Sequence, residues 1–288
     1  MTDDTHNNVL ASDAERVRAA SDAAISGGAS PEARPVIASE VAIPMPAGTC
    51  DAVFLHPETG TYPGVLLWPD GLGLRASLRE MGRRLVAAGY AVLVPNPFYR
   101  AARAPVFQGP FSFQNPTDRE RLRALVAPLH EAGAVDQDAR AYLAFLDAQP
   151  QVDRSRPVGT QGYCMGGALA LRTAAAQPQR VGAAASFHGG GLVTDQPDSP
   201  HLLAPSITAR AYVAIAANDD ARQPEAKDAL HAAFASAQVP AEIEVYPGTL
   251  HGWCIPDMPV EGGVPIYNEA AAERAWRKLL ALYQVALA

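Results

Sequence analysis

Short apolar runs alternate with stretches of helical periodicity along most of the chain. Residues 64–68, Gly-Val-Leu-Leu-Trp, are continuously apolar, as a strand buried on both faces should be. Beyond this run, apolar residues recur at helical spacing, at Leu78, Met81, Leu85 and Val86. A second apolar run follows at residues 90–94. Strand, helix and strand at this spacing predict a right-handed crossover within a parallel sheet.

The same alternation continues in both directions from this unit. Further strands are predicted at residues 36–43, 51–56, 156–159, 181–187, 209–217 and 241–246. Helices are predicted at residues 117–149 (in two pieces, broken near Pro128 and Gly133), at 168–172, at 224–238 and at 268–286. The first two strands are joined through residues 44–48 and are expected to begin the sheet as an antiparallel pair. The pattern predicts an α/β protein with a mostly parallel central sheet and helices on both faces.

Two segments do not follow this alternation. Residues 1–35 are rich in Ala, Ser, Asp and Pro, and a helix at 14–24 would be ended by Gly-Gly-Ala-Ser-Pro at 27–31. We predict a flexible or peripheral arm there, followed by a single domain over residues 36–288. Residues 95–116 lack periodicity but hold or adjoin four of the eight phenylalanines. A long irregular segment with this aromatic content predicts a pocket wall or partial lid. The alternative is a surface loop that packs its own aromatic rings.

Composition narrows the possible functions. Of the 288 residues 48% are hydrophobic, and the net charge is −7, whereas binding to nucleic acid needs a basic surface. No apolar run approaches the roughly 18 residues of a membrane span, and the N-terminus lacks the features of a signal peptide. We therefore expect a soluble, cytoplasmic protein with no nucleic-acid or membrane partner. The sequence does not indicate an oligomeric state.

The three cysteines form no disulfide framework and no metal-binding pattern. They are Cys50, Cys164 and Cys254, and neither C-x-x-C nor H-x-x-x-H spacing occurs. We expect reduced thiols and neither a metal nor another cofactor.

Residues 160–167, Thr-Gln-Gly-Tyr-Cys-Met-Gly-Gly, stand between a predicted strand and a predicted helix. Gly162 and Gly166 flank Cys164 at two positions on each side, which allows a sharp backbone corner that exposes the sulfur. At a helix N-terminus the backbone N–H groups and the helix dipole favour the thiolate. The pattern is the G-x-S-x-G elbow of α/β-hydrolases with sulfur in place of oxygen. The alternative is a buried structural cysteine in a glycine-rich turn.

Cys164, Asp219 and His251 follow three different predicted strands at the carboxyl edge of the sheet, where open α/β sheets bind ligands. Their order along the chain, nucleophile, acid and base, is that of the α/β-hydrolases. An imidazole is suited to take and return the thiol proton, and a carboxylate to orient that imidazole. Asp219 is the preferred carboxylate, with Asp220 as the alternative.

Several motifs together resemble those of the dienelactone hydrolase family, over a range from about residue 36 to the C-terminus. They are Gly-Tyr-Cys-Met-Gly-Gly at 162–167, Pro-Asp-Gly-Leu-Gly-Leu at 69–74, Gly-Tyr-Ala-Val-Leu-Val-Pro at 89–95, Tyr99-Arg100, the Asp219 turn and His251-Gly252-Trp253. The resemblance implies an α/β-hydrolase fold and a Cys164, His251, Asp219 triad. Such a triad cleaves a small ester or lactone through a thioester acyl-enzyme. It also implies that the backbone N–H groups of Met165 and Gly71 hold the oxyanion. Their positions agree with this role, because Met165 directly follows the nucleophile and Gly71 lies in the loop after the third strand.

The resemblance also implies that Asp70, Tyr99 and Arg100 bind the substrate, with two departures from the family pattern. The family has a glutamate, thought to hold the resting thiol proton, where the shorter Asp70 stands. Arg100 matches one of two arginines that grip a substrate carboxylate, but Ile255 occupies the position of the other. Because one arginine must then act alone, we expect a neutral or differently shaped ester or lactone rather than the carboxylated dienelactone.

Two further residues are candidates from their positions alone. His188 ends a predicted strand at the same edge, where it either lines the pocket or is a loop histidine with its hydrogen bonds satisfied. Trp253, beside the predicted base, is a candidate apolar wall. Two other functions remain open for the chain: a non-catalytic ligand-binding or interaction protein of the same fold, and an acyltransferase that uses the same thioester.

Overall fold

The computed structural model describes residues 35–288, so nearly all of the predicted N-terminal arm lies outside the described residues. A single eight-stranded sheet organises the described chain, in the order β1-β2-β4-β3-β5-β6-β7-β8. The strands are β1 (Val36–Met45), β2 (Gly48–Pro57), β3 (Gly64–Trp68), β4 (Ala91–Pro95), β5 (Val158–Tyr163), β6 (Val181–Phe187), β7 (Arg210–Ala216) and β8 (Ala241–Tyr246). β2 runs antiparallel to both of its neighbours, and all pairs from β4 to β8 are parallel. The predicted α/β fold with a mostly parallel sheet is confirmed.

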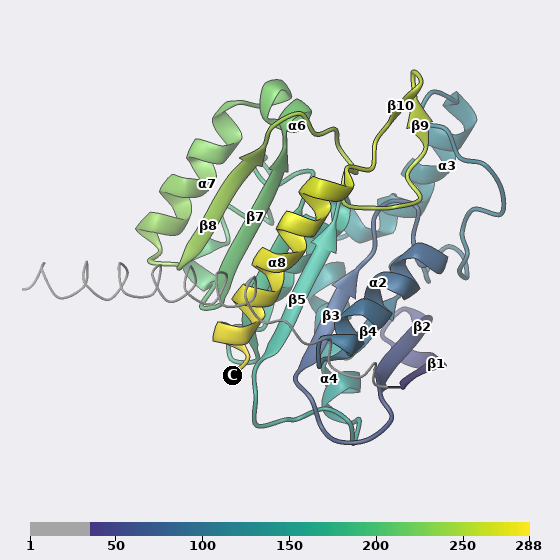
Figure 1. The fold of residues 1–288 in the computed structure, drawn as a ribbon, viewed down its shortest axis with the longest axis vertical. Helices are drawn as coiled ribbons and strands as arrows, with labels where there is room; N and C mark the ends of the chain where they lie inside the picture. Colours follow the sequence, from purple (N-terminus) through teal and green to yellow (C-terminus); the bar gives the residue numbers. More distant parts are fainter. Residues whose placement is uncertain (1–34) are drawn as a thin grey trace, which may run out of the picture.

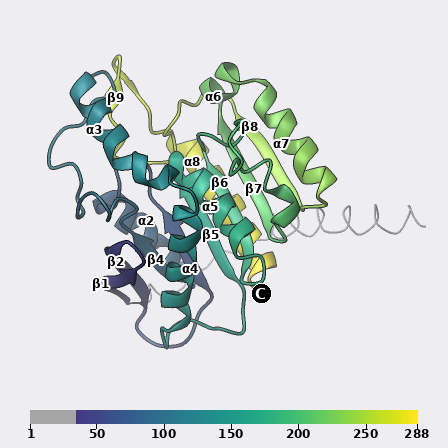
Figure 2. The same ribbon diagram turned by 180° about the vertical axis from the view of Figure 1, so that it is seen from behind.

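Helices cover both faces of this sheet. Figure 1 shows α2 (Ala76–Ala87) and α8 (Glu269–Ala286) across the front, and Figure 2 shows α4 (Ala134–Asp147) and α5 (Met165–Ala176) across the back. The remaining helices are α3 (Pro116–Val126), η1 (Ala127–His130), η2 (Ala204–Ser206), α6 (Ala217–Arg222) and α7 (Glu225–Ser236). Each face holds its own apolar cluster, because strands buried on both sides present side chains to both helix layers.

Local chemistry sets several helix boundaries. Asn115 accepts a hydrogen bond from the Thr117 N–H, and Asn268 accepts one from the Ala271 N–H, so each amide side chain caps the start of a helix. The predicted break near Pro128 and Gly133 is present, because η1 and a short turn separate α3 from α4.

Four features differ from the sequence-based expectations. β5 runs over Val158–Tyr163, whereas the sequence predicts the strand before the elbow at residues 156–159. β1 and β2 extend into the predicted connection and leave only residues 46–47 as a turn, with Met45 paired to Gly48. Asp219 and Asp220 lie in the first turn of α6 rather than in a loop. A small hairpin, β9 (Val260–Glu261) with β10 (Val264–Pro265), was not predicted, because two-residue strands carry no measurable periodicity.

The sheet brings the candidate residues to one edge. Four adjacent parallel strands, β5, β6, β7 and β8, end just before Cys164, His188, Asp219 and His251, respectively. β3 lies on the other side of β5 and ends before Gly71. Parallel strands end at a common edge, so residues up to 180 positions apart in the chain are placed around Cys164.

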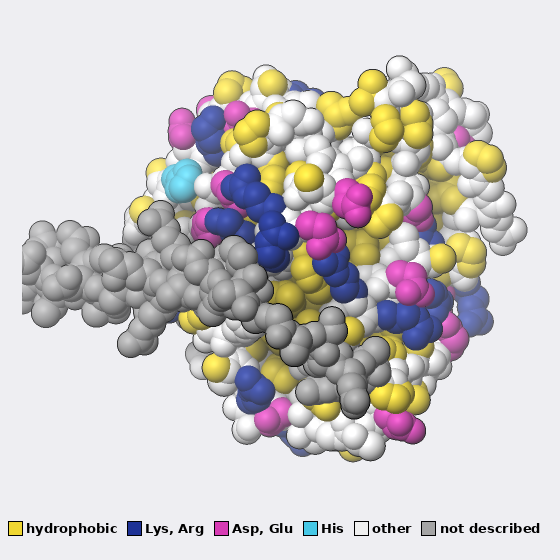
Figure 3. All heavy atoms as spheres, viewed as in Figure 1, with side chains coloured by type: hydrophobic (Ala, Val, Ile, Leu, Met, Phe, Trp, Pro, Cys, Tyr) yellow, Lys and Arg dark blue, Asp and Glu magenta, His cyan; other side chains and the backbone are white. Residues whose placement is uncertain are grey.

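The outer surface of the α2 and α8 layer carries charges of both signs. Figure 3 shows lysine and arginine side chains next to aspartate and glutamate side chains on this face. The pairs are Arg79–Glu40, Arg84–Glu273, Arg274–Glu244 and Lys278–Glu242. The face therefore offers mixed rather than uniformly basic charge.

Close packing of β5 against α8 gives a test of this arrangement. A Cβ atom at Gly159 would lie 2.9 Å from the Tyr283 ring, which is buried. Gly159→Ala is expected to lower the free energy of unfolding by about 1–3 kcal/mol through overpacking. Gly109→Ala is the matched control, because no atom lies within 4 Å of the added Cβ. Urea unfolding of both variants measures the difference, and equal stabilities would contradict the close packing of Tyr283 on Gly159.

Candidate active site

Cys164 stands at a strained corner between β5 and α5. Its backbone angles are φ 55° and ψ −123°, in a region that non-glycine residues rarely adopt. A Cβ atom at Gly162 would lie 1.8 Å from the Gly166 carbonyl oxygen, and one at Gly166 would lie 2.5 Å from the Pro69 carbonyl oxygen. Only glycine fits at either position, so the chain can turn sharply enough to leave Cys164 partly exposed.

The loop after β3 lies directly against the first turn of α5. A Cβ atom at Gly166 would lie 2.6 Å from the Trp68 carbonyl oxygen, so the loop that continues to Gly71 begins in close contact with α5. Among the described residues, the N–H groups of Gly71 and Met165 donate to no protein acceptor. Free amides of this kind can donate to an oxygen atom of a ligand.

The His251 imidazole lies against Asp219. Its Nδ1 is 2.6 Å from Asp219 Oδ2, and its backbone N–H donates to Asn218 Oδ1 at 2.8 Å. Asp220 instead accepts from the Lys227 ammonium at 2.9 Å. The structure thus pairs the histidine with the first of the two adjacent aspartates.

The surroundings of His251 favour its charged form. Burial alone would lower the pKa of this imidazole, but the negative charge of Cys164 and Asp219, with a hydrogen bond to each, raises the pKa to about 10. The imidazole is therefore charged at neutral pH, with Cys164 and Asp219 as the neighbours that stabilise its charge.

Asp70 anchors the loop that carries Gly71. Its two carboxylate oxygens accept from the Arg75 guanidinium at 2.6 and 2.9 Å, and Oδ1 also accepts from the Leu72 N–H. Arg75 donates in addition to Asp257 at 2.8 and 2.9 Å. No hydrogen bond among the described residues joins Asp70 to Cys164. This bridge, which the sequence analysis did not identify, ties the Gly71 loop to the chain that follows His251.

The structure argues against Arg100 and Tyr99 as substrate-binding residues. Two guanidinium nitrogens of Arg100 donate to the fully buried Asp138 at 2.6 and 2.8 Å, and the Tyr99 hydroxyl donates to the same carboxylate at 2.8 Å. Asp138 therefore occupies the edge of Arg100 that would grip a substrate carboxylate. Ile255 is fully buried in the cluster under α2 and α8, whereas Tyr99 packs against the cluster on the other face. An isoleucine in this core supplies no cation, so the second arginine of the family pattern has no charged counterpart at that position.

His188 and Trp253 are buried rather than exposed to a pocket. His188 is 1% exposed and Trp253 0%. The Trp253 ring stacks on Tyr246, with ring centroids 4.4 Å apart, and so forms part of the core beneath His251. Burial does not fit Trp253 as an apolar pocket wall or His188 as a pocket-lining residue. The alternative for His188, a loop histidine with its hydrogen bonds satisfied, does not fit either, because its buried Nε2 has no partner among the described residues.

The aromatic segment at residues 95–116 packs around the Gly71 loop. A Cβ atom at Gly73 would touch Phe98 and Val106 at 3.2–3.3 Å, and one at Gly71 would touch Leu122 of α3 at 3.2 Å. The segment therefore supports the loop of the candidate oxyanion site, and Leu122 is the apolar side chain nearest to it. Leu122 was not singled out from the sequence, since a leucine in an amphipathic helix is ordinarily a core residue.

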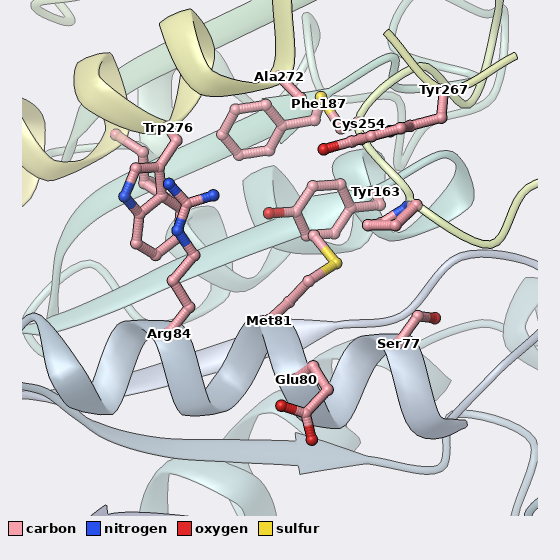
Figure 4. A pocket seen from close by; sticks show the side chains of 12 residues that line it. Ser77, Glu80, Met81, Arg84, Tyr163, Phe187, Cys254, Tyr267, Ala272 and Trp276 are labelled. Atoms are coloured by element: carbon pink, nitrogen blue, oxygen red, sulfur yellow. The ribbon is translucent and has the colours of Figure 1, made fainter. Parts of the chain in front are cut away.

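A cavity of about 300 Å³ lies between α2 and α8 (Figure 4). Its walls include Tyr163 and Phe187, which immediately precede Cys164 and His188, together with Met81 and Trp276. None of Cys164, Asp219 and His251 lines it. The cavity is therefore separate from the candidate catalytic groups.

The other cysteines are chemically protected. Cys50 is buried, and burial raises the pKa of its thiol to about 12. Burial also raises the pKa of the Cys254 thiol well above its usual value. Within residues 35–288 no three His, Cys, Asp or Glu side chains are grouped as metal ligands, and no helix has the length and apolar character of a membrane span.

Comparison with known proteins places this chain in one family. A model of the dienelactone hydrolase family matches residues 50–287. The chain belongs to the dienelactone hydrolase family. It is 27% identical over 246 residues to a carboxymethylenebutenolidase of Rhodococcus opacus, across 82% of this chain and 87% of that protein.

Solved structures agree with this assignment. A dienelactone hydrolase-like promiscuous phosphotriesterase from metagenomic libraries superposes with a TM-score of 0.72 at 26% identity, over 88% of this chain and 99% of that one. The Pyrococcus horikoshii acylaminoacyl peptidase shares the fold, with a TM-score of 0.63 at 16% identity over 88% of this chain and 42% of that one.

The ion-pair bridge predicts a large effect of one substitution. Asp70 is 4% exposed and Arg75 14% at the side chain, so Arg75→Leu leaves a buried carboxylate without its partner. We expect a loss of about 3 kcal/mol or more in the free energy of unfolding. Arg79→Leu is the control, because its ion pair with Glu40 is exposed and should contribute less than about 1 kcal/mol. Denaturant titrations of the two variants test this. Similar losses would show that the buried ion pair contributes no more to stability than the exposed one.

Proposed function

We propose that this protein hydrolyses a carboxylic ester or lactone through a thioester on Cys164, with His251 as general acid and base and Asp219 as its orienting carboxylate. The single observation that carries the proposal is the His251–Asp219 contact of 2.6 Å beside the strained Cys164 corner. The non-catalytic alternative gives no reason to maintain a strained backbone and a polar pair at one site. Family membership supports hydrolysis over acyl transfer.

In the first half of the reaction, the Cys164 thiolate attacks the carbonyl carbon and the carbonyl electrons move to the oxygen. The Met165 and Gly71 N–H groups donate to this oxyanion. When the carbonyl re-forms, the C–O bond to the leaving group breaks. The departing oxygen takes the proton from His251 Nε2, which leaves a thioester and a neutral imidazole.

In the second half, neutral His251 removes a proton from water, and the resulting hydroxide attacks the thioester carbonyl. Collapse of this intermediate breaks the C–S bond and releases the acid, which restores the thiolate and the imidazolium. Asp219 accepts a hydrogen bond from Nδ1–H throughout, so Nε2 stays directed at the reacting atoms. The products are an acid and an alcohol, or a single hydroxy acid from a lactone.

We further propose that the substrate is uncharged at its acyl part. Arg100 is neutralised by Asp138, and Ile255 is buried, so neither of the family arginine positions supplies a free cation. Leu122 adds an apolar surface next to Gly71. This differs from what the name of the Rhodococcus relative, carboxymethylenebutenolidase, indicates for that protein.

Replacement of the nucleophile provides the direct test. Cys164→Ala is expected to reduce kcat/KM on nitrophenyl esters and small lactones by about a thousandfold or more, because the covalent route is lost. A mass spectrum of the parent quenched during turnover should carry the acyl mass on Cys164.

A second cysteine, Cys254, supplies the control. Cys254→Ala should retain turnover and the adduct, since that thiol is buried and protonated. Undiminished activity in Cys164→Ala, or an adduct on another residue, would defeat the thioester mechanism.

The raised pKa of His251 predicts a pH limb. Because the charged imidazole protonates an alkoxide leaving group, kcat/KM for a simple alkyl ester should fall as pH rises through about 10, where His251 loses its proton. Asp219→Asn removes a negative charge and should move this limb to lower pH by about one unit or more.

Asp220→Asn is the matched control, since Asp220 pairs with Lys227 instead of His251. A pH-stat measurement between pH 6 and 10.5 records all three profiles. A limb that moves equally in both variants would rule out Asp219 as the specific partner.

A further inference from the structure

His188 shares with Cys164 an uncommon backbone conformation. The described chain has three non-glycine residues with positive φ: Cys164 at 55°, His188 at 39° and Gln238 at 56°. A positive φ is sterically unfavourable for a residue that carries a side chain. Two of the three are hydrogen bonded to each other, because the Cys164 N–H donates to His188 Nδ1 at 3.1 Å.

The turn at residues 188–190 holds both backbone polar groups of the nucleophile. The Cys164 N–H is shared between His188 Nδ1 and the Phe187 carbonyl oxygen, each at 3.1 Å, and the Cys164 carbonyl accepts from the Gly190 N–H at 3.2 Å. The His188 N–H itself donates to the Ala214 carbonyl at 2.7 Å, which fastens the turn to β7. The corner at Cys164 is thus held from β6 and β7 as well as from its own helix.

The His188 ring is neutral and has a defined tautomer. Since Nδ1 accepts from Cys164, the ring proton lies on Nε2. Burial, and then the charge of His251, lower the pKa of His188 well below its usual value. Nε2 is buried with no partner among the described residues, which is unfavourable for a polar group. The ring packs edge to face on His251, with ring centroids 5.1 Å apart.

We propose that His188 is a positioning residue for the reaction proposed above: its Nδ1 holds the Cys164 amide and so directs the sulfur toward His251. A strained residue with an unsatisfied donor is unfavourable for stability, so its presence next to both reacting groups points to function. A misplacement of about 1 Å between reacting groups can cost about a hundredfold in rate.

Two substitutions separate the hydrogen bond from the packing. His188→Phe keeps an aromatic ring against His251 but has no acceptor for the Cys164 N–H. His188→Asn loses the ring but places an amide oxygen near the former Nδ1, and asparagine tolerates left-handed φ. The readouts are kcat and KM on an alkyl ester, the alkylation rate of Cys164 by iodoacetamide, and the thermal unfolding midpoint.

We expect His188→Phe to lower kcat by about tenfold to a hundredfold, with KM changed less than about threefold, and to slow alkylation. His188→Asn should remain within about threefold of the parent in kcat, in KM and in the alkylation rate. Parent-like kcat and alkylation in His188→Phe would overturn the proposal. So would equal impairment in both variants, because packing rather than the acceptor would then matter.

If His188→Phe does not fold, His188→Gly replaces it, because glycine adopts left-handed φ without strain and also lacks the acceptor. Impairment of the Gly variant relative to the Asn variant supports the proposal, and equal rates overturn it. Alkylation needs no turnover, so a failure of the proposed hydrolysis, seen as activity in Cys164→Ala, is distinguishable from a failure of the His188 role.

Discussion

The site depends on one backbone corner, at which Cys164 is held in a conformation that an ordinary residue avoids. Gly162 and Gly166 permit the corner, because a Cβ atom at either position would clash with a backbone carbonyl oxygen. The surrounding turns hold it, because Cys164 has hydrogen-bond partners for both its N–H and its carbonyl. The cost of the strain, about 1–2 kcal/mol, is small against the packing of an eight-stranded sheet. A chain of this size can therefore carry the corner without losing its fold.

Buried charge organises the surroundings of this corner in two different ways. Asp70, Arg75 and Asp257 link two loops that arrive from distant parts of the chain. Asp138 pairs with Arg100, so this guanidinium is not free to bind a negatively charged substrate group. Both follow from one constraint, that a charge removed from water needs a partner. The carboxylate beside His251 also has a neighbour of opposite charge, because Asp219 lies 3.4 Å from the exposed Arg222 guanidinium.

Local patterns allowed most of the architecture to be predicted. The strands at residues 36–43, 181–187 and 241–246 and the helix at 268–286 appear within a few residues of the expected bounds, because burial on one or both faces leaves a periodic trace. The hairpin β9–β10 and the start of α6 left no such trace. Elements of two to six residues depend on their tertiary neighbours more than on their own sequence.

The sequence by itself determined the order of the chemistry: a cysteine between spaced glycines, then an aspartate and a histidine, each after a strand of a parallel sheet. It did not decide between Asp219 and Asp220, which differ only in the direction that one turn of α6 gives to each carboxylate. Nor did it show that Arg100 is already paired, or that His188 and Trp253 lie below the surface. Pairing and burial are set by residues such as Asp138 and Tyr246, far away in the chain. Only the folded arrangement brings them into contact.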